Sequence, residues 1–326
     1  MVKKISKWFL GIFSVWLVSH AMLTHAQDYP SRSIQLIVPS TPGTTGDQLA
    51  RLLGPRLSQR WNVPVVVENK VGAGGSIGIE AAAKANPDGY NLLFSATAFS
   101  TLTAIRSNLP YDPVKDFVHV VQLGKSPLVL VVANSVPAHN VKEFIDHVKR
   151  MPPGRLNYAS PGIGSVQHLT MELFKQQTGI HMTHIPYKGM SGALNDLSAG
   201  HVEAGVVVLQ TALPLLQSGK MRVLAIMGPE RVSQFPKIPT LSEAGVPGVV
   251  SEAWFGITAP ARTSRVVIDK LNQEVNRLLS LDDIKTALEK IGVTPIGGTP
   301  EKMNAMVQGE INTWLKVVRY GGIKAD

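Results

Sequence analysis

Apolar runs of strand length alternate along this chain with stretches whose apolar residues recur at helical spacing. The runs predict two series of strands, at residues 34–39, 63–68 and 92–95, and then at 128–133, 156–159, 184–187, 204–209 and 223–227. The stretches at helical spacing predict helices such as 76–85, 141–149 and 168–177, and residues 96–100 are predicted as a polar connection. This alternation is typical of α/β proteins with largely parallel sheets.

Both series repeat one unit, a strand followed by a loop of small residues and then a helix. The repetition favours two domains over one. A returning strand is predicted at residues 253–259, and helices are predicted after it at 265–280, 282–291 and 300–320. Thr299 and Pro300 support the start of the last helix, because a hydroxyl cap followed by proline is a frequent helix beginning.

The N-terminal residues 1–26 are typical of an export signal. Three lysines precede a short apolar run at residues 8–19, and Ala26 is the kind of small residue that a signal peptidase reads. The run is too short for a membrane-spanning helix, which needs ~20 residues. Because the chain has no cysteine, it has no thiol for a lipid anchor. We therefore expect an exported chain from residue 27, periplasmic in a host with two membranes.

Composition and charge narrow the functional classes. The chain has 326 residues, of which 44% are hydrophobic and 17% charged, as in ordinary globular proteins. The lack of cysteine excludes a disulfide framework and thiolate metal sites. The formal net charge is +9, but basic residues are scattered without aromatic interleaving, so we expect no nucleic-acid partner.

One string resembles the nucleophile elbow of serine hydrolases. Gly74, Ser76 and Gly78 have the required spacing. The elbow needs its serine directly after a strand, whereas Ser76 stands well beyond the strand predicted to end at Glu68. A periplasmic hydrolase that uses Ser76 is therefore kept only as an alternative hypothesis.

Other catalytic and metal patterns also fail. Lys125 and Ser126 resemble the end of a phosphate-binding loop, but His119 stands where its first glycine is required. His181 and His184 are three residues apart in a predicted loop-to-strand segment, where their side chains would diverge instead of sharing a metal ion. We expect no catalytic residue, no metal and no cofactor.

Two small polar loops remain as binding candidates, at residues 41–47 and 160–165. Each follows a predicted strand and precedes a predicted helix. Free backbone N–H groups and the positive end of the helix dipole meet there, which suits a carboxylate. The alternative is that these glycine, serine and threonine residues serve only as turn and capping residues.

A series of short motifs resembles the Bug family, the periplasmic solute receptors of tripartite tricarboxylate transporters. No single motif is specific, but many stand in the right order and spacing over essentially the whole mature chain. They are Val-Val-Val-Glu-Asn at 65–69, Gly-Ala-Gly-Gly at 72–75, Asn-Pro-Asp-Gly-Tyr at 86–90, Leu-Pro-Tyr-Asp-Pro-Val-Lys-Asp-Phe at 109–117, Leu-Asn-Tyr-Ala-Ser at 156–160, Ile-Pro-Tyr-Lys-Gly at 185–189, Pro-Thr-Leu-Ser-Glu-Ala-Gly at 239–245, Trp-Phe-Gly at 254–256 and Gly-Gly-Thr-Pro-Glu at 297–301.

The resemblance implies a two-domain periplasmic binding protein of type II, a venus-flytrap fold with mixed sheets flanked by helices. The implied domains are residues 27–124 together with 252–326, and residues 125–251, with chain crossings near 123–126 and 251–255. A small carboxylate would bind between the domains of a monomer, and the loaded form would dock on the membrane permease subunits. Some members of the family act as ligand sensors for a signalling partner, so that alternative stays open.

The resemblance also implies the ligand loops. The first is the 41–47 loop, the second contains Gly75 and Ser76, and the third is the 160–165 loop, with His168 behind it. The residues carried over are Thr41, Gly43, Thr44, Thr45, Asp47, Gly75, Ser76, Ser160, Gly164 and Ser165.

One departure from the family pattern bears on the ligand. Many members have Asp followed by Ser or Asn where this chain has Val207 and Val208. A polar ligand group facing two valines would lose a hydrogen bond, at a cost of roughly 1–3 kcal/mol. We therefore expect an apolar aliphatic or aromatic acid. The alternative is that Val207 points into the core.

Overall fold

The computed structural model describes residues 29–324, so the predicted export signal lies outside the described residues. The strands are β1 (Ile34–Val38), β2 (Val65–Asn69), β3 (Asn91–Ala96), β4 (Phe117–Ala133), β5 (Asn157–Ser160), β6 (Thr183–Pro186), β7 (Ala204–Val208), β8 (Met221–Ile226), β9 (Glu252–Pro260) and β10 (Thr294–Pro295). The helices are α2 (Thr45–Trp61), the short 3-10 helix η1 (Ala73–Gly75), α3 (Ser76–Ala83), α4 (Ala98–Ile105), α5 (Val141–Arg150), α6 (Val166–Thr178), α7 (Met190–Ala199), α8 (Leu209–Gln217), α9 (Arg265–Ser280), α10 (Asp282–Lys290) and α11 (Pro300–Gly321). Within residues 29–324, no helix is both long and apolar enough to cross a membrane.

The strands form a mixed sheet, which confirms the predicted α/β class. Its order is β2-β1-β3-β9-β4-β7-β5-β6, with β8 and β10 also paired to β4. β1, β2 and β3 are parallel to one another, as are β5, β6 and β7. The antiparallel pairs β3–β9, β9–β4 and β4–β7 connect the two parallel groups.

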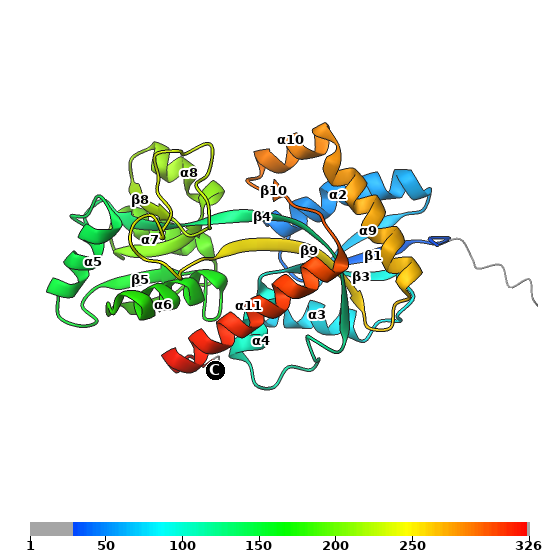
Figure 1. Cartoon of the computed structure of the whole chain (residues 1–326), viewed down its shortest axis with the longest axis horizontal. Coiled ribbons are helices and arrows are strands. Elements are labelled where there is room, and N and C mark those ends of the chain that lie inside the picture. Colours follow the sequence, from blue (N-terminus) through cyan, green and yellow to red (C-terminus); the bar gives the residue numbers. More distant parts are fainter. Residues whose placement is uncertain (1–28, 325–326) are drawn as a thin grey trace, which may run out of the picture.

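Two long strands run between the two halves of the molecule (Figure 1). β4 pairs with β9 over residues 117–127 and with β7 and β8 beyond residue 127. Only the apolar second part, residues 128–133, was predicted as a strand. The first part was missed because polar residues such as His119, Gln122 and Lys125 interrupt its apolar pattern, and pairing with β9 supplies the hydrogen bonds that make it a strand.

Two helices were also missed. α4 lies where a polar connection was predicted, because its Ser100 and Thr101 hide an otherwise apolar helix and are themselves buried. α8 begins directly after β7 and contains Pro214, a residue that usually argues against a helix interior.

The register places the carboxyl ends of both parallel groups of strands near the region where β4 and β9 pass from one half of the molecule to the other. β3 runs in the same direction as β4 and β7 runs against it, so the ends of β3 and β7 point toward each other. Ala96, at the end of β3, is level with Gly124 through Phe255, and Val208, at the end of β7, pairs with Leu128. Four residues of strand separate the two levels, which is about 13 Å at ~3.3 Å per residue. Ligands of open α/β sheets bind at such strand ends.

Three clusters of buried side chains hold the fold together. One lies between the first half of the sheet and α2, α9 and α10, and another lies between the second half and α7 and α8. The third cluster continues through both halves and includes side chains of α4, α6 and α11. α11 runs along the lower side of the sheet in Figure 1 and reaches α6, where Gln176 Nε2 donates to Val317 O at 3.0 Å.

Candidate functional site

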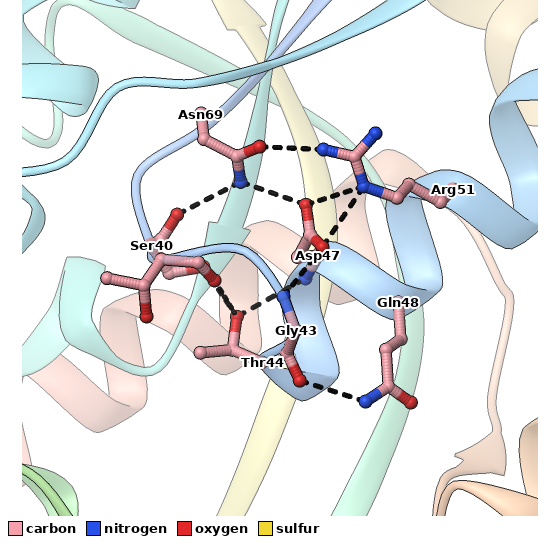
Figure 2. Close-up of polar contacts among 8 residues, drawn as sticks. Ser40, Gly43, Thr44, Asp47, Gln48, Arg51 and Asn69 are labelled. Carbon is pink, nitrogen blue, oxygen red and sulfur yellow. Dashed lines mark hydrogen bonds and ion pairs between the residues drawn. The ribbon is translucent and has the colours of Figure 1, made fainter.

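The loop between β1 and α2 is held from inside by Asp47 (Figure 2). The Asp47 carboxylate is 3% exposed and accepts hydrogen bonds from Gly43 N at 2.9 Å, Asn69 Nδ2 at 2.9 Å and Arg51 Nε at 3.0 Å. Burial acts to raise the pKa of Asp47, but the donors from Arg51, Gly43 and Asn69 outweigh it and lower the pKa. Asp47 therefore has its acceptor sites filled by the protein, and its role is to shape the loop.

Thr44 caps α2 and uses its hydroxyl within the same loop. Thr44 Oγ1 donates to Thr41 O at 2.9 Å, so the hydroxyl of Ser40, 2.9 Å away, must donate to it. The same oxygen accepts from Asp47 N at 3.5 Å. Among residues 29–324, the N–H groups of Thr45 and Gly46 have no hydrogen-bond partner, as is usual in the first turn of a helix. These two N–H groups, together with that of Thr41, are the donors of the 41–47 loop that no group of the described chain occupies.

The loop between β5 and α6 is built in the same way. Ser160 is fully buried, and its hydroxyl contacts His184 Nε2 at 2.6 Å as well as the N–H and C=O of Gly162. Ser165 caps α6 by accepting from His168 N at 3.2 Å and donates to Gly162 O at 2.8 Å.

The remaining donors of the 160–165 loop follow from these bonds. Gly164 N donates to His168 Nδ1 at 3.0 Å, so it is not available to a ligand in this arrangement. The N–H groups of Ile163, Val166 and Gln167 have no partner in the described part of the chain. The 160–165 loop stays a predicted ligand loop, and within it Ser160, Gly164 and Ser165 use their polar groups to hold its shape.

The third predicted loop leads into α3. Gly75 has φ +105°, where a side chain would be strained, and a Cβ there would approach Pro39 O to 3.2 Å. Ser76 is the first residue of α3 and is 4% exposed. No histidine contacts its hydroxyl within residues 29–324, so the arrangement needed for a serine nucleophile is not found in the described chain.

The two valines of β7 point to opposite faces of the sheet. Val207 is 1% exposed and lies in the buried cluster under α7 and α8, while Val208 is partly buried against the cluster that includes α6 and α11. The strand alternation therefore directs Val207 into the core, which was the alternative left open by the sequence. The argument that Val207 selects an apolar ligand loses its support.

Two isoleucines that sequence analysis did not select are exposed, one next to the loop before α3 and one in the 160–165 loop. Ile77, in the first turn of α3, is 50% exposed, and Ile163, in the 160–165 loop, is 48% exposed. Both loops rest on α4. A Cβ on Gly74 would lie 3.4 Å from Leu102, and one on Gly164 would lie 1.9 Å from Ile105, one turn further along. The available signal for Ile163 was a large apolar residue inside a loop otherwise made of small residues.

Metal binding finds no support in the described residues. No group of three or more His, Asp or Glu side chains comes together within residues 29–324. His181 is exposed, whereas His184 is partly buried and bonded to Ser160.

Comparison with known proteins decides the family. The TctC family, described as "Tripartite tricarboxylate transporter family receptor", matches residues 49–323. The chain belongs to this family. Among curated TctC relatives, protein BugT of Bordetella pertussis is 37% identical, and the match covers 97% of each chain.

Solved structures of TctC-type receptors have the same fold. Rpa4515 of R. palustris, solved with adipate, is 36% identical with a TM-score of 0.81, covering 91% of this chain and 99% of that one. MatC of Rhodopseudomonas palustris, with bound malate, is 32% identical with a TM-score of 0.77, covering 89% and 100%. The periplasmic binding protein BugD is 30% identical with a TM-score of 0.77, covering 91% and 100%. The predicted kinship with Bug receptors is confirmed.

Proposed function

We propose that this TctC-family protein captures a small carboxylate between its two halves in the periplasm and delivers it to the permease subunits of a tripartite tricarboxylate transporter. The two halves would be residues 27–124 with 252–326, and residues 125–251. Export would follow from residues 1–26.

The observation that carries the proposal is the pair of matching helix beginnings. In both α2 and α6 a hydroxyl cap occupies the third N–H of the helix and leaves the first two, those of Thr45 and Gly46 and of Val166 and Gln167, without a partner in the described chain. The strands before these helices end toward each other. The free N–H groups at the beginning of each helix can bind one carboxylate, so a dicarboxylate can bind to both helices at once.

The relatives agree with this chemistry. Adipate in Rpa4515 and malate in MatC are both dicarboxylates, and the second carries a hydroxyl group in addition. In the present chain Ile77 and Ile163 expose apolar surface at the loops. We therefore favour an acid with an apolar chain between its carboxylates. This preference is based on Ile77 and Ile163, whereas sequence analysis used Val207 and Val208.

The proposal can be tested at the backbone N–H groups themselves. Proline at the first helical position fits a helix and removes only the N–H. A residue that precedes proline must have an extended backbone. Thr44 and Ser165, which precede these two positions, are already extended, with φ −68° and ψ 160° and with φ −64° and ψ 154°. Thr45→Pro and Val166→Pro should each weaken adipate binding about 10- to 100-fold, because a hydrogen bond to a charged group contributes ~1.5–3 kcal/mol.

Matched controls isolate the N–H group. Thr45→Ala and Val166→Ala change the side chains and keep the donors, so calorimetry should give them affinities near that of the wild type. Equal adipate affinity in the proline and alanine variants would contradict the assignment of these donors. No thermal stabilisation of the wild type by any mono-, di- or tricarboxylate would contradict the proposed function.

A further inference from the structure

Three aromatic rings form a stack behind the 160–165 loop. The His184 ring of β6 stacks on the rings of both His168 and Tyr158, with centroid distances of 4.0 Å and 4.8 Å and interplanar angles of 12° and 17°. The His168 and Tyr158 centroids are themselves 6.3 Å apart. The three residues come from α6, β5 and β6, so the stack joins the elements on both sides of the loop.

Both histidines bind the loop through a ring nitrogen. His184 Nε2 lies 2.6 Å from Ser160 Oγ, and Ser160 Oγ in turn contacts Gly162 N at 3.1 Å. His168 Nδ1 accepts from Gly164 N at 3.0 Å, so the proton of this ring is on Nε2. Alternate N–H groups of the loop, at Gly162 and Gly164, are thus held by the stack.

The stack itself is anchored on its far side. The Tyr158 hydroxyl donates to Glu172 Oε1, and Lys175 Nζ lies 2.6 Å from the same carboxylate and 5.2 Å from the centre of the Tyr158 ring. Burial lowers the pKa of His168 to about 4, and burial together with His168 lowers that of His184 to about 3. Both imidazoles are therefore neutral near neutral pH, as a close stack of two histidines requires.

We propose that His184 is a positioning residue for ligand binding, which holds Ser160 and so aims the N–H groups of Ile163, Val166 and Gln167 at the ligand carboxylate. This inference rests on the proposed function. Packing alone does not account for an imidazole here, because a phenylalanine ring could stack against Tyr158 and His168 in the same way. What the imidazole adds is the bond to Ser160.

The test compares His184→Phe with the wild type by two independent measurements. In the unliganded protein, amide hydrogen exchange at Gly162 should become at least about threefold faster, because the Ser160 hydroxyl that holds this N–H loses its own partner. Calorimetry with adipate should show an affinity lower by about tenfold. In His184→Gln the side-chain amide can still bond to Ser160, so both the exchange rate and the affinity should lie closer to the wild-type values than in His184→Phe. Ser160→Ala removes the same bond from the other side and should reproduce the effects of His184→Phe.

His181→Phe is the matched control, since His181 is exposed and lies just before β6. It should leave exchange and affinity unchanged. Wild-type exchange and affinity in both His184→Phe and Ser160→Ala would overturn the proposal, and so would faster exchange with unchanged affinity. Failure of the proposed function is seen separately, as the absence of carboxylate binding by the wild type.

Discussion

The indole Nε1 of Trp254 donates a hydrogen bond to Glu310 Oε2 at 2.5 Å and so connects the crossing strand β9 to α11. Two further polar atoms, Ser100 Oγ on α4 and Trp314 Nε1 on α11, are buried without a partner of good geometry in the described chain. Both are close enough to the Glu310 carboxyl to lower its pKa, as does Trp254. Burial has the larger effect, and with a small contribution from Glu252 it raises the pKa of Glu310 to about 7.

Because the pKa of Glu310 is raised, the free energy of unfolding should depend on pH, and Glu310→Gln should remove this dependence. The folded protein binds this proton more tightly than the unfolded chain, so the stabilisation is complete below the unfolded pKa near 4.5 and is lost as pH rises through about 7. Relative to Glu310→Gln, the free energy of unfolding of the wild type should fall between pH 5 and pH 8 by on the order of 3 kcal/mol.

Urea unfolding at a series of pH values, followed by tryptophan fluorescence, measures this difference. Glu301→Gln is a suitable control because Glu301 is an exposed residue of the same helix whose pKa is lowered, chiefly by Arg265. It stays ionised over this pH range in both states. Parallel pH curves for the wild type and Glu310→Gln would show that Glu310 does not titrate there.

Removal of the Asp47 carboxylate should destabilise the protein and disorder the 41–47 loop. Asp47→Ala leaves the Gly43 N–H and the side chains of Asn69 and Arg51 without their common acceptor, so we expect a loss of about 2–4 kcal/mol. Because the pKa of Asp47 is lowered in the fold, its contribution is present above the unfolded pKa and is lost as pH falls through the folded one.

Chemical denaturation at neutral pH measures the Asp47→Ala effect. Asp146→Ala is the control, because Asp146 is a half-exposed residue that pairs, within residues 29–324, with Lys142 across one helical turn. The expected change for such a pair is within about 0.5 kcal/mol. If both variants lost the same stability, the buried network would not be what orders the loop.

Contact between the two halves at Gly164 should be sensitive to a single methyl group. Gly164 has φ +77°, and a Cβ there would lie 1.9 Å from Ile105 Cδ1 on α4. Gly164→Ala should therefore favour separation of the halves and lower the free energy of unfolding by more than the backbone cost of ~1–2 kcal/mol alone. Gly179→Ala measures that backbone cost, because Gly179 has φ +65° with no atom within 4 Å of its Cβ position.

A double-mutant cycle separates the contact from the backbone. Ile105→Ala makes room for the new methyl group, so the double variant should be more stable than the sum of the single changes predicts. Small-angle scattering should show a larger radius of gyration for Gly164→Ala than for Gly179→Ala. Additive stabilities and equal radii would mean that Gly164 and Ile105 do not meet in solution.

The sequence predicted the elements whose hydrophobic pattern is local and missed those that depend on partners. The apolar residues that mark β1 and β7 stand close together in the sequence, but the first part of β4 is a strand because β9 lies beside it. The same limit applies to the site. Small residues at 41–47 and 160–165 predicted these loops as binding candidates, but which of their N–H groups are occupied depends on acceptors such as Asp47 and His168. The shape of the loops also depends on Asn69 and His184, which lie 29 and 24 residues from their bonding partners Ser40 and Ser160.

The exposed isoleucines predict which acids the protein distinguishes. If Ile77 and Ile163 contact the chain of the ligand, Ile163→Ser should reduce the affinity for adipate by about tenfold, since burial of such a side chain contributes ~1.5–3 kcal/mol when complete. Malate has a shorter chain with a hydroxyl group, so its affinity should change less. Calorimetry with both acids gives the ratio, and Val250→Ser, at an exposed apolar residue before β9, is the control. An equal loss for adipate and malate would show that Ile163 acts on the loop and not on the apolar chain, because only contact with that chain can separate the two acids.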